Sequence, residues 1–94
     1  MKKIFKLSHP KTKRPRLIEA AKHDVRKYLK RERSKVLPEG ADFWDFDCKA
    51  GTTSEDAQEI HWSKIPDFID QTDEKQLDSF YVQIVAKAAS RIKN

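Results

Sequence analysis

The sequence predicts an α+β fold of the ferredoxin-like type, in which two helices cover one face of a four-stranded antiparallel sheet. Four segments have the alternating polarity or the β-branched and aromatic content of strands, and two have apolar residues at helical spacing. Their order along the chain is β-α-β-β-α-β, as in the ferredoxin-like sandwich. A chain of 94 residues buries only one modest core, so residues 1–94 are expected to form a single domain. The alternative is another α+β arrangement in which the third strand is a loop.

The first part of the chain predicts a short strand followed by a long helix. Charged and apolar side chains alternate over residues 3–7, which is typical of a strand. Pro15 suits the first turn of a helix, because the N–H group that proline lacks has no intrahelical partner there. The helix is expected to run from residue 15 to about residue 36. Its core-facing stripe is predicted to consist of Ile18, Ala21, Val25, Leu29 and Val36.

The rest of the chain predicts three strands and a short helix. Residues 43–49 alternate as a strand, residues 57–62 return as the third strand of a hairpin, and Ser63 caps a helix that reaches about residue 71. Residues 79–86 form the last strand, and residues 88–94 are expected to be a frayed tail. The two faces of the second strand are Trp44, Phe46 and Cys48, and Phe43, Asp45 and Asp47. The predicted core contains Ile18, Val25, Leu29, Trp44, Phe46, Phe68, Val82 and Ile84.

Charge is distributed unevenly along the chain. The formal net charge is +5, but residues 1–35 hold 14 Lys and Arg against 3 Asp and Glu, whereas residues 36–78 hold 3 against 12. No apolar run approaches the roughly 20 residues that span a bilayer, and no secretion signal is recognised at the start. Cys48 is the only cysteine, which suits a reducing compartment. A cytoplasmic protein without a membrane partner is therefore expected.

Eleven Lys and Arg residues lie between Lys11 and Lys35, in the long helix and the loop before it. Such a basic segment can neutralise phosphates and bind nucleic acid in a salt-dependent way. The leading hypothesis is therefore a noncatalytic binding module that engages RNA or another polyanion and needs no cofactor. The simpler interpretation is a solvated helix face that pairs with the acidic middle of the same chain. The predicted nucleic-acid-binding residues are Lys11, Lys13, Arg14, Arg16, Lys22, Arg26, Lys27, Lys30, Arg31 and Arg33.

An acidic pattern on the second strand suggests an alternative function. Asp45 and Asp47 project from one side of the strand, about 7 Å apart. Glu59 and His61 share a face of the next strand, so the four side chains are candidate ligands for Mg²⁺ or Mn²⁺. The alternative is thus a divalent-metal-dependent phosphoester hydrolase or transferase. Charged strand faces are, however, common on solvated sheets. The sequence contains no recognised catalytic motif, and no catalytic residue is assigned.

Several short segments carry a resemblance to a known family. They are SHPK at residues 8–11, KRER at 30–33, LPEG at 37–40, FWDFDCK at 43–49 and SFYV at 79–82. With these segments the chain resembles, over nearly its whole length, a family of small uncharacterised bacterial proteins with an LPEG and then an FWDFDCK signature. The resemblance implies a bacterial origin and one compact domain. It implies no activity and assigns no site residue.

Overall fold

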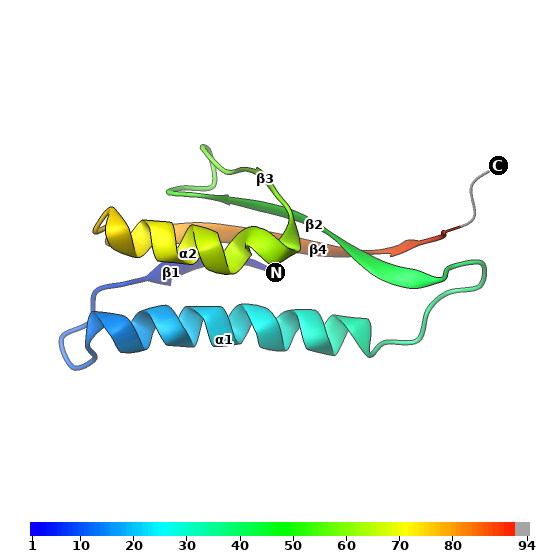
Figure 1. Cartoon of the computed structure of the whole chain (residues 1–94), viewed down its shortest axis with the longest axis horizontal. Helices are drawn as coiled ribbons and strands as arrows, with labels where there is room; N and C mark the ends of the chain where they lie inside the picture. The colour runs from blue at the N-terminus through cyan, green and yellow to red at the C-terminus, as the bar shows by residue number, and fades with distance from the viewer. Residues whose placement is uncertain (92–94) are drawn as a thin grey trace.

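The computed structural model describes residues 1–91, which form one four-stranded sheet and two α-helices. The elements are β1 (Lys2–Lys6), α1 (Arg14–Arg33), β2 (Phe43–Gly51), β3 (Gln58–Ile60), the short 3₁₀-helix η1 (Trp62–Lys64), α2 (Ile65–Glu74) and β4 (Ser79–Ala89). Figure 1 shows α1 along the length of the molecule, and α2 packs against α1. The α+β class and the antiparallel four-stranded sheet are as predicted.

The order of the strands within the sheet differs from the predicted one. It is β1-β4-β2-β3, with every neighbouring pair antiparallel, and this is not the order of the ferredoxin-like sandwich. The ferredoxin-like prediction was therefore wrong in its topology. The strand lengths give a physical reason. The two longest strands, β2 with 9 residues and β4 with 11, pair with each other from Phe43↔Ala89 to Gly51↔Tyr81. Central strands satisfy backbone hydrogen bonds along both edges, and the shorter β1 and β3 take the two edges.

The core lies between the helices and one face of the sheet. On β2 and β4, the pairs Cys48↔Ile84 and Ala50↔Val82 face the helices. These side chains form one cluster with buried residues of both helices, so both helices pack on this face. Six residues of the predicted core are buried, namely Ile18, Val25, Leu29, Phe46, Val82 and Ile84. The other two, Trp44 and Phe68, are half-buried against the cluster.

The end of α1 differs from the prediction. The helix stops at Arg33, and Val36, predicted to lie on the core stripe, is 92% exposed. Ser34 is the residue at which the helix ends; its backbone angles are still helical, and its hydroxyl donates to the carbonyl oxygen of Lys30 at 3.0 Å. Just after the helix, the backbone carbonyl oxygen of Lys35 accepts a hydrogen bond from the indole N–H of Trp44 at 2.9 Å. The chain therefore leaves the helix toward β2, and Val36 stays in solvent.

The segment between β3 and α2 also differs from the prediction. β3 covers only Gln58–Ile60, so His61 and Trp62 are not strand residues. His61 caps η1 instead, since its Nδ1 accepts the backbone N–H of Ser63 at 3.2 Å. Ser63 is thus a donor inside the turn and not the cap of α2, which runs to Glu74.

The last strand is longer than predicted. β4 includes residues 88–89, which were assigned to the frayed tail, and residues 92–94 of that tail lie outside the described residues. Within residues 1–91, no helix combines the length and apolar character needed to cross a membrane.

Candidate functional site

Two of the ten predicted nucleic-acid-binding residues are ion-paired to α2. Arg14 Nε donates to Asp73 Oδ1 at 2.5 Å, and its Nη2 donates to the carbonyl oxygen of Thr72 at 3.2 Å. Lys22 Nζ lies 2.6 Å from Asp70 Oδ1. Both basic side chains are more buried than the carboxylates they meet. For Arg14 and Lys22, the interpretation that the helix pairs with the acidic middle of the chain is therefore correct.

The other basic residues of α1 are exposed. They form what we call the basic surface of α1: Arg16, Arg26, Lys27, Lys30, Arg31 and Arg33. None of the six makes an ion pair with a carboxylate within residues 1–91. Lys11 and Lys13, in the loop before the helix, are exposed as well.

The acidic residues of α1 are already engaged elsewhere. They are Glu19, Asp24 and Glu32, which lie 3.9 Å from Lys22, 3.2 Å from Lys3 and 2.8 Å from Lys35. The positive charge of the basic surface is thus not compensated by the helix itself.

The spacing on this surface concentrates the charge. Arg26 and Lys30, like Lys27 and Arg31, are four residues apart, which places each pair on one side of the helix about 6 Å apart along its axis. Like charges at this spacing destabilise a helix by about 0.2–0.5 kcal/mol per pair. Cations near the end of a helix are favoured by its dipole, which accounts for Lys30, Arg31 and Arg33 but not for the others. A bound anion would relieve this repulsion.

A groove lies beside the basic surface, between α1 and the η1 segment. Its volume is about 600 Å³, and we call it the Trp62 groove. It is lined by Val25, Arg26, Leu29, Lys30, Arg33, Ser34, Trp62, Ser63 and Pro66. The guanidinium carbon of Arg33 lies over the Trp62 ring, 4.2 Å from its centroid, and 5.3 Å from the centroid of Phe46.

Sequence reasoning missed this groove. Trp62 was placed on a strand, and Arg33 was counted only as a phosphate contact. They meet because η1 brings Trp62 back beside the end of α1, and no local pattern in the sequence indicates that contact.

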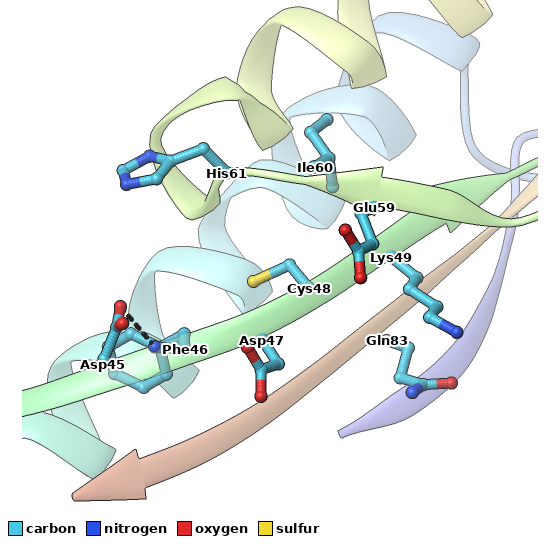
Figure 2. Close-up of a pocket in the computed structure, with 9 residues that line it drawn as sticks. All are labelled: Asp45, Phe46, Asp47, Cys48, Lys49, Glu59, Ile60, His61 and Gln83. Carbon is cyan, nitrogen blue, oxygen red and sulfur yellow. Dashed lines mark hydrogen bonds between the residues drawn. The ribbon is translucent and has the colours of Figure 1, made fainter. Parts of the chain in front are cut away.

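The four predicted metal ligands lie around a second depression, the acidic cavity. Asp45, Asp47, Glu59 and His61 all line it, and its volume is about 410 Å³. Figure 2 shows their side chains spread along β2, β3 and the turn after β3 rather than pointing to one position. No group of three or more His, Cys, Asp or Glu side chains in residues 1–91 is arranged to hold a metal ion.

The local contacts explain why the four do not converge. Asp47 Oδ1 accepts a hydrogen bond from Lys87 Nζ at 2.8 Å, and this contact raises the pKa of Lys87. Asp45 Oδ1 accepts the backbone N–H of Phe46 at 2.8 Å. β3 ends one residue before His61, so the pairing that would set this side chain opposite Asp47 stops at Cys48↔Ile60.

Cys48 also lines the acidic cavity, but its side chain is buried on the helix-facing side of β2. Burial, together with the negative charges of Asp47 and Asp45, raises the pKa of the thiol to about 11. The thiol is therefore neutral near pH 7 and packs as a small apolar group, as its position on the strand predicted.

Comparison with known proteins gives a family but no activity. Residues 1–94 match the model of a family described as Family of unknown function (DUF6172). No curated protein and no solved structure matches the chain. The resemblance to an uncharacterised family is thus confirmed, while the bacterial origin stays a prediction. The chain belongs to DUF6172.

Proposed function

We propose that this member of the DUF6172 family is a noncatalytic binding module that engages RNA or another polyanion through the basic surface of α1. One observation carries the proposal: six exposed Lys and Arg side chains lie on one helix and none is ion-paired to a carboxylate within residues 1–91. On the same helix, Arg14 and Lys22 do form ion pairs with carboxylates of α2. The remaining positive charge is available to a partner.

The chemistry of such an interface is mainly electrostatic. Each cation that meets a phosphate releases a counterion from the nucleic acid, so affinity falls as salt rises. Four contacts, from Arg26, Lys27, Lys30 and Arg31, to a single strand predict a slope of about −3 for log K against log salt concentration. Cations on a helix contact the backbone and carry little sequence information. The proposed binding is therefore tolerant of sequence.

Fluorescence anisotropy with labelled mixed-sequence RNA and DNA tests the proposal. The critical variant combines Arg26→Glu, Lys27→Glu and Lys30→Glu. Its matched control combines Lys49→Glu, Lys64→Glu and Lys75→Glu, which are exposed, lie outside α1 and change the formal charge by the same amount. At roughly 50 mM salt, we expect the α1 variant to bind at least about tenfold more weakly than the control.

Two results would reject the proposal. One is an absence of binding by the wild-type protein to either nucleic acid at low salt. The other is an equal loss in both triple variants, which would show that net charge matters and the basic surface of α1 does not.

A further inference from the structure

We infer that the Trp62 groove receives an unstacked nucleobase, so that the partner is a single-stranded nucleic acid. This inference rests on the proposed function and specifies its ligand. The groove and the basic surface share three residues, Arg26, Lys30 and Arg33, so one strand can contact both. Its volume of about 600 Å³ lies within the roughly 300–1,000 Å³ typical of sites for small organic groups.

The floor of the groove is apolar. Val25 and Leu29 of the core form its α1 side, and the half-buried Trp62 and Pro66 form the opposite side. A phosphate does not bind to such a floor, because burying a charge against apolar groups is unfavourable. A planar base fits it, since every base has an apolar face that stacks on aromatic side chains regardless of sequence.

The rim of the groove is cationic. Arg26 and Lys30 are exposed and stand one helical turn apart, about 6 Å along α1, where they can meet the phosphates on either side of an inserted base. The Arg33 guanidinium is held over the Trp62 ring at 4.2 Å, which fixes a third cation at the end of the groove. Planar guanidinium groups and aromatic rings are the surfaces on which single-stranded RNA bases stack.

The extent of the charge favours a polymer over a small anion. Lys27 and Arg31 continue the basic surface beyond the groove, and Arg16 extends it toward the start of α1. A duplex could satisfy these cations but keeps its bases stacked inside, and extruding one costs unstacking energy. A single strand presents both phosphates and bases, and it is the occupant that uses the cationic rim together with the apolar floor.

The test compares single strands that differ in one respect at a time, either the bases or the ribose hydroxyl. An oligouridine of about ten nucleotides, its deoxyuridine counterpart and an abasic deoxyribose strand of the same length carry similar phosphate charge. We expect both base-containing strands to bind at least about fivefold more tightly than the abasic strand. A difference between the first two would show whether the ribose hydroxyl contributes.

Ring removal provides a second comparison. Trp62→Leu keeps an apolar side chain but removes the stacking surface, and Phe43→Leu is its matched control, because Phe43 lies under Arg91 on the other face of β2, outside the groove. We expect Trp62→Leu to bind oligouridine about as weakly as the wild type binds the abasic strand, and Phe43→Leu to bind normally. A dispersed amide NMR spectrum checks that each variant is folded.

A third measurement keeps Trp62 in place, so its result does not depend on whether the Trp62→Leu variant folds. In a Trp44→Phe background, Trp62 is the only tryptophan, and its fluorescence should be quenched by oligouridine and not by the abasic strand. Equal affinity for base-containing and abasic strands, or no quenching on saturation with oligouridine, would overturn the nucleobase site while leaving polyanion binding intact. Failure of every strand to bind would overturn both proposals.

Discussion

The basic surface of α1 and the open face of β2 both carry closely spaced like charges, and the surroundings of these charges differ. On β2, Asp47 is hydrogen-bonded to Lys87, and Asp45 accepts a backbone N–H. On α1, Arg26 and Lys30 meet no carboxylate among residues 1–91. A run of like charge is thus a candidate binding surface only where the fold does not already compensate it. By this criterion α1 is the candidate binding surface, and β2 contributes mainly to the structure.

The largest expected effect tests whether β2 mainly stabilises the fold. Phe46→Ala should lower the free energy of unfolding by about 3–5 kcal/mol, because it removes a buried ring from the core and leaves a cavity. Asp47→Ala, at the next position on the exposed face, should change it by less than about 1 kcal/mol. Urea unfolding followed by circular dichroism measures both. A loss at Asp47 as large as that at Phe46 would contradict the assignment of a solvated charge.

A smaller effect concerns Cys48, on the buried side of the same strand. Its pKa is raised in the folded state from the ordinary 9.0 to about 11, so folding favours the protonated thiol. This contribution is fully present below pH 9 and is lost as the pH rises through 11. We expect raising the pH from 8 to above 11 to destabilise the wild type by about 2 kcal/mol more than it destabilises Cys48→Ala. Equal pH dependence of the two proteins in urea titrations would show that the thiol is not desolvated.

The third effect compares a cation of α1 that is ion-paired with one that is not. Arg14→Ala removes the contacts to Asp73 and Thr72 and should cost about 1 kcal/mol of stability, with little change in RNA affinity. Arg26→Ala should leave stability within about 0.5 kcal/mol and weaken RNA binding. Thermal unfolding together with anisotropy separates the two results. If both variants lost stability equally, the distinction between compensated and uncompensated cations would fail.

The smallest expected effect concerns the acidic cavity and the alternative function. Titration with Mn²⁺, followed by residue-resolved NMR, should broaden no signals selectively around residues 45–47 and 59–61, because the four side chains do not converge. Selective broadening at micromolar metal that disappears in Asp45→Asn would instead support the metal-dependent phosphoester hydrolase or transferase.

Local patterns in the sequence predicted much of the fold. Alternation placed Phe46 and Cys48 on the buried face of β2, and helical spacing gave Ile18, Val25 and Leu29 as core residues. These predictions succeeded because one amphipathic element determines which of its own sides is buried. Strand order depends on the pairing of β2 with β4, which are far apart in the sequence, and no local pattern encodes it.

The candidate site was predictable in composition but not in arrangement. The basic residues of α1 are evident in the sequence, whereas their division into paired and unpaired sets depends on how α2 packs beside α1. His61 was misplaced because a cap and a strand residue have the same extended backbone geometry. The Trp62 groove depends on both packing and that cap, so it emerged only from the structure.

The position of β1 at the edge of the sheet gives part of the basic charge another role. An edge strand presents unpaired backbone groups that can recruit a strand from another molecule, and lysines along it oppose such aggregation. Three of the five residues of β1 are lysines. Lys3 reaches Asp24 on α1, while Lys2 and Lys6 are exposed beside the edge. The lysines of β1 therefore favour colloidal stability, and neutralising them should promote self-association without changing the affinity proposed for the basic surface of α1.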